Sequence, residues 1–305
     1  IALDDRVVPN YSGDLLPANS LEVQFNRFVV ERSEGKQVDL KIEQYITAYK
    51  ARVDEKRAQQ IGWPSRWPSE VQSALAPTWF VQSTNEHTAK LAEHWTKGNP
   101  QAMTPYMLAK YLAKQVVGYY QPEGRSLVHD NHTKLTGVRV QGSDHAAKNR
   151  RGSWHDLVTL YVGVLRASGI PARPVIGIDR REGENEEALV SWAEFYLPTA
   201  GWVSVDMRRL KESPGMTHTL ERPWEGFGTN DRLNDMVPLA HHFHPPYNVQ
   251  AEGREKYQAS KRNQWPLLWG WIPVPDPIPT DQQLSILVMD APQRGDTNRG
   301  RRGRR

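Results

Sequence analysis

Apolar residues recur at helical spacing in three parts of the chain, at 85–97, 103–120 and 154–168. Positions three and four residues apart lie on one face of a helix, so each part is expected to bury one stripe of side chains. The second part opens with Thr104 and Pro105, a good helix cap followed by a residue that suits the first helical position. Three helices are therefore predicted in the middle of the chain.

Three strand-like segments follow the last of these helices, at 172–178, 188–197 and 201–207. Gly169 accommodates the left-handed conformation that closes a helix, and Pro171 prevents the helix from resuming. A charged turn and a short PTAG turn join the segments, so the strands should form an antiparallel meander. The prediction is an α+β fold in which one helix packs on an antiparallel sheet.

The N-terminal region is expected to form an extended arm and a small β unit. Residues 1–19 are polar and contain Pro and Gly, whereas LEVQFNRFVVE from Leu21 and VDLKIEQYITAYKA from Val38 alternate apolar and polar positions. Such alternation predicts two half-buried strands, with RSEGKQ as the turn between them. A Trp/Pro-rich connector, IGWPSRWPSE from Ile61, leads to the helices.

The C-terminal region has little periodicity. WPLLWGWIPVPDPIP contains too much proline for an interior strand or helix, so we predict an extended wrapping segment held by Trp265, Trp269 and Trp271. SILVMD, residues 285–290, is predicted to form an edge strand.

These patterns divide the chain into four parts. The predicted division is an arm and β unit at 1–76, a core at 77–210, an irregular Pro/Trp/His-rich wrap at 211–290 and a disordered tail at 291–305. Within the core, residues 121–149 are predicted to be loop.

None of the 305 residues is a cysteine. This excludes disulfides, thiolate metal sites and a cysteine nucleophile. A chain without thiols suits an oxidising compartment, so we expect an extracytoplasmic location, periplasmic or membrane-peripheral, although the cytoplasm is also compatible. No run of eighteen apolar residues occurs, so the chain is not expected to be transmembrane.

The net charge of +4 is concentrated in the last fifteen residues, which contain six arginines and one aspartate and leave the rest near neutral. A Gly/Arg tail of this kind can contact an acidic protein face, lipid head groups or RNA, or have no fixed partner. The candidate interface residues of the tail are Arg301, Arg302, Arg304 and Arg305.

The region around the third predicted helix resembles the transglutaminase-like superfamily. RASGIPAR, residues 166–173, matches the family's Arg-Ala-x-Gly-Ile-Pro-Ala-Arg motif at every typed position. SWAEFYLPTAGWVSVD, residues 191–206, matches most of the family's two following strands. The resemblance covers about residues 77–210 and implies a papain-like core. In that family a cysteine at the helix N-terminus, a histidine on the neighbouring strand and an aspartate on the next carry out acyl transfer.

The sequence departs from this family pattern at two of the three positions. The resemblance assigns Trp154 to the cysteine position, Val190 to the histidine position and Asp206 to the aspartate position. Without a nucleophile and a base, Asp206 has nothing to orient. The resemblance thus implies the fold and an inactive site, with the Trp154 side chain filling the cleft.

Neighbouring residues offer alternative roles. Ser153 and Asp156 have the spacing of a capping box, which explains Ser153 better than a nucleophilic role does. His155 is expected to be packed or at the surface. Glu194 is expected to be a structural hydrogen-bonding residue. His242 and His244 would share one face of a strand and are weak candidates for zinc ligands, so no metal is predicted.

The leading hypothesis is a catalytically inactive protein that serves as a structural or interaction subunit with other protein subunits and no cofactor. Aromatic anchors on proline-stiffened segments suit such a role. Two alternatives stay open. One is a hydrolase or acyltransferase with a relocated catalytic group, and the other is a module that binds a peptide or glycan in the remnant cleft.

Overall fold

The computed structural model of the protein describes residues 2–4, 27–29, 52–129, 135–179, 181 and 188–243. At the N-terminus, β1 (Ala2–Asp4) pairs antiparallel with β2 (Arg27–Val29). The strand predicted from Leu21 therefore contains β2. Its partner β1 comes from the segment that was expected to be an arm, and the strand predicted from Val38 lies outside the described residues.

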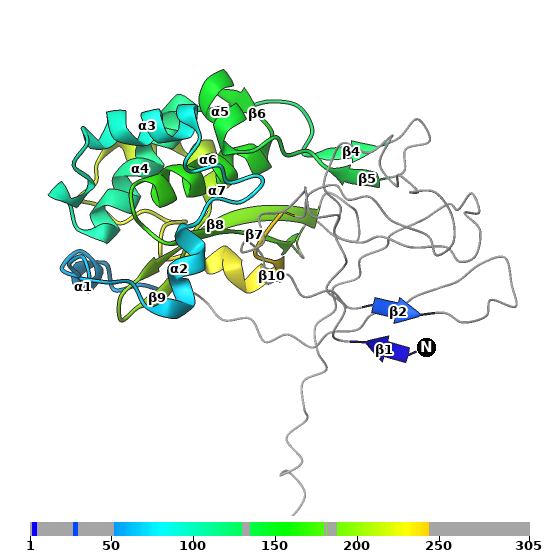
Figure 1. The fold of residues 1–305 in the computed structure, drawn as a ribbon, viewed down its shortest axis with the longest axis horizontal. Coiled ribbons are helices and arrows are strands. Elements are labelled where there is room, and N and C mark those ends of the chain that lie inside the picture. Colours follow the sequence, from blue (N-terminus) through cyan, green and yellow to red (C-terminus); the bar gives the residue numbers. More distant parts are fainter. Residues whose placement is uncertain are drawn as a thin grey trace, which may run out of the picture.

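Helices form one layer of the structure (Figure 1). They are α3 (Glu86–Thr96), α4 (Pro105–Tyr119), α5 (Ser143–Asn149) and α6 (Trp154–Ala167). The three predicted helices are confirmed as α3, α4 and α6. No helix in the described part of the chain is long and apolar enough to cross a bilayer.

A four-stranded antiparallel sheet forms the second layer, in the order β10-β7-β8-β9 (Figure 1). β7 (Ala172–Asp179), β8 (Leu189–Leu197) and β9 (Gly201–Val205) are the predicted meander. The edge strand β10 (Met236–Ala240) was not predicted, because it is short and contains Pro238. Proline lacks the N–H that an interior strand would need, so it suits this edge. The predicted α+β fold, a helix packed on an antiparallel sheet, is confirmed.

Short elements connect these layers. Before the helices lie α1 (Glu55–Ala58), α2 (Ser69–Gln72) and η1 (Ser73–Leu75), and η2 (Pro100–Ala102) joins α3 to α4. After β9 come α7 (Met207–Glu212), η5 (Pro214–His218) and η6 (Asp231–Asp235).

The prediction that residues 121–149 form a loop was wrong. This stretch holds β3 (Gln121–Pro122), the hairpin of β4 (Leu127–His129) and β5 (Leu135–Val138), and helix α5. β3 pairs in parallel with β6 (Arg151–Gly152). These elements are too short to show a periodic pattern, so their signal is lost among turn residues.

The largest hydrophobic cluster is built around α6, whose side chains are buried from His155 to Arg166. It takes in residues as early as Ala58 and as late as Phe227. The domain boundaries at 76/77 and 210/211 stay predictions, but the cluster draws side chains from both sides of each.

Lys110 is a fully buried charge within this core. Its ammonium group pairs with the carboxylate of Glu55 and donates a hydrogen bond to the Arg222 carbonyl at 2.7 Å. It also lies 4.8 Å from the centre of the Trp224 ring. A buried charge is tolerated only when it is paired in this way, so Lys110 fixes α1 and the segment after η5 against α4.

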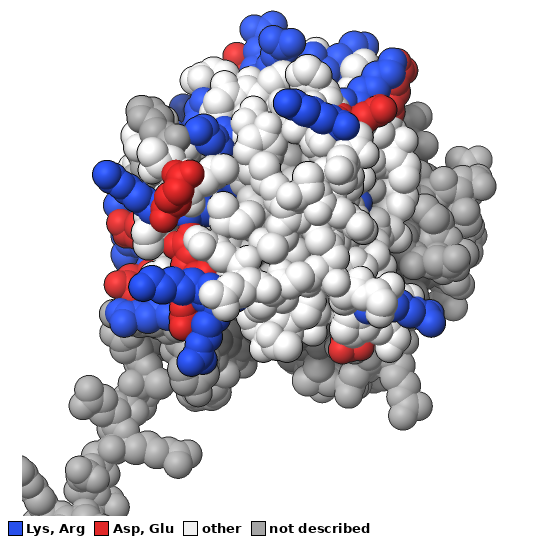
Figure 2. All heavy atoms as spheres, turned by 90° about the vertical axis from the view of Figure 1, so that its left-hand side faces the viewer, with Lys and Arg blue, Asp and Glu red and all other residues white. Residues whose placement is uncertain are grey.

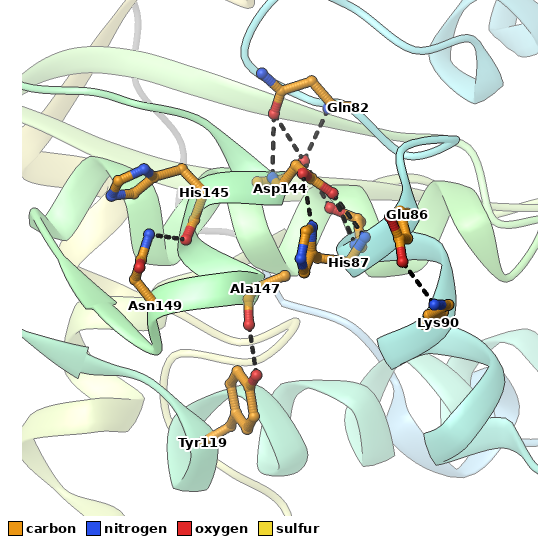
Figure 3. A network of polar contacts seen from close by, with 11 residues as sticks. Gln82, Glu86, His87, Lys90, Tyr119, Asp144, His145, Ala147 and Asn149 are labelled. Atoms are coloured by element: carbon orange, nitrogen blue, oxygen red, sulfur yellow. Dashed lines mark hydrogen bonds and ion pairs between the residues drawn. The ribbon is translucent and has the colours of Figure 1, made fainter.

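Helices α3, α5 and α6 approach closely at Gly163. A Cβ atom added at Gly163 would lie 2.7 Å from the Ser143 Cβ and 3.0 Å from the Thr88 Cγ2. Polar contacts hold the same three helices. The Asp144 carboxylate accepts hydrogen bonds from the His87 and Thr88 amides and pairs with the His87 ring, as Figure 3 shows in part. This network therefore has a structural task, the capping of α3 by α5.

Charged side chains are unevenly spread over the surface. Figure 2 shows the side of the molecule on which α1 lies in Figure 1, and its Lys, Arg, Asp and Glu residues gather toward the margins. The centre of this view is uncharged.

Candidate functional site

The first turn of α6 is the place where the family resemblance locates the chemistry. The Ser153 hydroxyl accepts a hydrogen bond from the Asp156 amide at 3.1 Å, and Asp156 Oδ2 accepts one from the Ser153 amide at 3.2 Å. The predicted capping box is confirmed. The other Asp156 oxygen accepts from the Gln141 and Gly142 amides. Burial raises the pKa of Asp156, while these hydrogen bonds act in the opposite direction.

Trp154 is the first residue of α6. Its side chain is half-buried and packs against the main hydrophobic cluster. The Arg208 guanidinium lies 5.4 Å from the centre of its ring, and Arg208 also pairs with Glu212 at 2.8 Å. The indole thus contributes to packing between α6 and α7, with a cation above its face.

Val190 lies on β8, opposite Gly177 of β7. It packs against a separate hydrophobic cluster of Val175, Trp192 and Met236. The adjacent Ser191 faces α6, where it contacts His155. Because side chains alternate along a strand, Val190 points to the other face of the sheet.

Asp206 follows β9 and caps α7. Its Oδ1 accepts a hydrogen bond from the Arg209 amide at 2.9 Å. Its Oδ2 is buried and has no hydrogen-bond partner among the described residues. Burial raises the pKa of Asp206, and the positive charges of Arg232 and Arg208 partly oppose this. The Asp206 carboxylate therefore caps α7 through one oxygen, and the other oxygen is available for a further hydrogen bond.

His155 and Ser191 form a pair that the sequence did not reveal. His155 Nδ1 lies 2.8 Å from the Ser191 hydroxyl, and the imidazole is only 1% exposed. Its Nε2 is buried without a partner in the described chain, and the Phe243 ring packs on it edge-on. Burial lowers the pKa of His155 to about 3, so the ring is neutral at physiological pH.

A comparison with family models matches residues 94–207 to the one described as the transglutaminase-like superfamily. This segment runs from the end of α3 to the start of α7 and includes all of α6 and the β7–β9 meander. The chain contains a transglutaminase-like core.

Several solved structures are similar to part of this chain. A candidate cysteine protease from Cytophaga hutchinsonii is 18% identical, with a TM-score of 0.38, and the match covers 51% of this chain and 48% of that one. The periplasmic domain of TgpA from Pseudomonas aeruginosa is 22% identical, with a TM-score of 0.35, covering 52% and 53%. Red sea bream transglutaminase is 14% identical, with a TM-score of 0.29, covering 42% and 27%.

The chain spans about half the length of the first two of these structures. No curated protein gives a significant match to the sequence.

Within the transglutaminase-like core, the assignment of Trp154, Val190 and Asp206 to the family's nucleophile, base and aspartate positions stays a prediction. The structure gives each of them a packing or capping contact. The whole chain lacks cysteine, so no thiolate can form anywhere in it.

Glu194 has the kind of structural partner that was expected. Its carboxylate pairs with Arg173 at 2.7 Å across β7 and β8. The Arg173 guanidinium in turn lies 3.9 Å from the centre of the Trp202 ring. Both charged groups are largely buried, so this pair links the three strands of the meander.

Of the two weak candidates for metal ligands, the structure describes only His242. Burial lowers the pKa of His242 to about 4, with Arg166 nearby adding to the effect, and His242 Nδ1 has no hydrogen-bond partner in the described chain. His244 lies outside the described residues. Among the residues that the structure describes, no group of three or more His, Asp or Glu side chains could hold a metal.

The predicted interface residues also lie outside the described part of the chain. They are Trp265, Trp269, Trp271, Arg301, Arg302, Arg304 and Arg305. Their roles stay predictions.

Proposed function

We propose that the protein is a catalytically inactive transglutaminase-like protein that serves as a structural or interaction subunit of a larger, extracytoplasmic protein assembly. The observation that carries the proposal is Trp154 at the N-terminus of α6. A helix N-terminus stabilises a thiolate through its dipole and its free amides, so it is the place where the family's chemistry needs a small sulfur. Here it carries a large indole.

The surroundings of Trp154 support the same proposal. The Asp156 carboxylate accepts a hydrogen bond from the Ser153 amide at this helix end, and Asp206 caps α7. Val190 contributes to an apolar cluster. Each of these groups therefore contributes to the fold, and the one Asp206 oxygen without a partner has neither a nucleophile at Trp154 nor a base at Val190 to orient.

The His155–Ser191 contact favours a second candidate, a serine hydrolase with relocated groups. A serine nucleophile needs an adjacent base and a third group that orients that base. His155 is an adjacent base, but a pKa near 3 makes it a weak one, and no carboxylate contacts it among the described residues. This geometry fits a buried structural pair better than a catalytic one.

The deciding experiment is to isolate the protein gently from its own cells, measure its native mass and identify neighbours by cross-linking and mass spectrometry. We expect a stable complex, with cross-links from residues 1–19 or 265–290. A clean monomer without cross-links would overturn the scaffold proposal. Loss of a measurable hydrolase activity in Ser191→Ala, with the fold intact, would favour the second candidate.

A designed variant tests the inactive site directly. Trp154→Cys combined with Val190→His restores the residue types of the family, and we expect it to show little acyl transfer from a glutamine peptide to an amine. The reason is that Trp154 packs against the main hydrophobic cluster, whereas Val190 points to the face of the sheet away from α6 and packs in a separate cluster, so the two new groups would not be held together. Robust activity in this double variant would mean that the site is otherwise intact, and the proposal that it was repurposed would be wrong.

A further inference from the structure

The Trp/Pro-rich connector after α1 forms a pocket at the end of α6 opposite to Trp154. The pocket has a volume of about 390 Å³, and its walls come from residues 63–67 of the connector, from η2 and from the last turn of α6. With 14 residues, α6 places the pocket about 21 Å from Trp154. It is therefore distinct from the remnant catalytic site, and its volume is within the range of small-molecule sites.

Two indole rings form one corner of this pocket. The Trp63 and Trp67 rings lie 6.1 Å apart at an interplanar angle of 72°. The Trp63 ring N–H donates to the Met103 carbonyl at 2.7 Å, and the Trp67 ring N–H donates to the Gly169 carbonyl at 3.0 Å. These bonds to distant segments fix both rings, so the corner is preformed.

The sequence around the rings adds stiffness. Pro64 and Pro68 follow the two tryptophans directly, and proline restricts the backbone of the loop. Tyr196 packs edge-on against Trp67 and continues the aromatic contact to Trp202. A loop that is rigid before binding loses little conformational entropy when a ligand arrives.

The chemistry of the corner selects the class of ligand. Because both ring N–H groups are already used, the indoles can offer a ligand only their carbon ring surface and not a donor. Indole faces carry negative charge density, which attracts weakly positive C–H bonds. Groups that recognise proline-rich peptides usually donate a hydrogen bond to a peptide carbonyl, and these two rings have no donor left for one.

The rim provides polar groups without a strong net charge. Arg66, Gln101 and Ser65 are exposed around the pocket. Ser168 also lines it, and the buried Ser168 hydroxyl has no hydrogen-bond partner among the described residues. Because this hydroxyl is enclosed, the exposed Arg66 and Gln101 side chains are polar groups that a ligand could reach.

We propose that this pocket binds a neutral sugar ring, presented by an oligosaccharide or polysaccharide. One C–H face of the ring would stack on an indole, and its hydroxyl groups would bond to Arg66 and Gln101. This function is additional to the proposed structural role.

Binding is tested by calorimetry on the full chain with three neutral probes: cellohexaose, maltohexaose and hexa-N-acetylchitohexaose. We expect saturable binding of at least one probe, unchanged by 0.5 M salt because the ligand is neutral. Trp67→Ala should weaken this binding by tenfold or more. The matched control is Trp79→Ala, which removes an exposed indole outside the pocket and should leave binding unchanged.

A second variant keeps the test decisive if Trp67→Ala does not fold. Arg66→Ala with Gln101→Ala alters only exposed side chains and should weaken binding about three- to tenfold, as expected for the loss of solvent-exposed hydrogen bonds. Absence of binding by all three probes at 10 mM would overturn the proposal. So would equal binding by wild type and all pocket variants, or binding of a decaproline peptide that displaces the sugar.

Discussion

At the scale of single residues, the start of α6 is a capped and packed helix end. Ser153 and Asp156 cap the helix, and the Arg208 guanidinium lies over the ring of Trp154. The capping box follows from the spacing of two residues in the sequence, so it was predictable. The His155–Ser191 contact depends on how α6 lies against β8, and the sequence has no local signal for that.

His155 gives the stability of the protein a pH dependence that can be measured. Its pKa is lowered from 6.5 to about 3 by burial. Below pH 6.5 the unfolded state therefore binds a proton that the folded state does not, and stability is lost as the pH falls toward 3. The loss reaches about 1.4 kcal/mol for each pH unit at most.

Urea unfolding at pH 7.5, 6 and 5 checks this, with His155→Gln as the variant. We expect His155→Gln to have a lower unfolding free energy than the wild type at pH 7.5. The difference in unfolding free energy between the two proteins should become smaller as the pH falls. Asp156 and Asp206, whose pKa values are raised, act in the opposite direction, but they are present in both proteins. Ser191→Ala keeps the buried imidazole and should keep the wild-type slope. If the unfolding free energies of wild type and His155→Gln changed equally with pH, the His155 imidazole would not titrate as described.

At the scale of elements, the long periodic segments were predictable and the short ones were not. α3, α4 and α6 have clear apolar stripes, and the β7–β9 meander follows Gly169 and Pro171. α5 has seven residues and β10 has five, too few for a period to stand out. The Trp63–Trp67 pocket was visible only as a Trp/Pro-rich connector, since its walls come from three distant segments.

The contact of α3, α5 and α6 at Gly163 predicts a costly substitution. Gly163→Ala would place a methyl group against Ser143 and Thr88, and we expect a loss of about 1–3 kcal/mol in unfolding free energy. Gly118→Ala is the matched control, because Gly118 is an exposed residue of α4 with nothing within 4 Å of an added Cβ. It should stabilise by about 0.5–1 kcal/mol. Equal effects of the two changes in thermal unfolding would contradict the close approach of the helices.

At the scale of the whole molecule, the core extends beyond the transglutaminase-like segment at both ends. Ala58 and Val53 pack on it from one side, and Trp224 and Phe227 from the other. The motifs that identify the family say nothing about these flanks, so the sequence predicted a boundary where the packing is continuous. Lys110 reinforces this, since its partners Glu55 and Arg222 lie in the two flanks.

This continuity predicts how fragments should behave. A fragment of residues 52–243 should unfold in urea in a single transition, with tryptophan fluorescence and circular dichroism changing together. A fragment of residues 77–210 should be far less stable, because Lys110 would lose the Glu55 carboxylate while staying in an apolar core. If the two fragments had similar unfolding free energies, the flanking segments would not be needed for the stability of the core.

The burial of α6 on all sides also has a consequence during synthesis. The helix leaves the ribosome after α3, α4 and α5, but before β7 and β8, which also pack against it. Until those strands follow, part of an apolar helix is exposed to other proteins. The growing chain therefore passes through a stage in which a chaperone has a binding surface that the finished molecule does not offer.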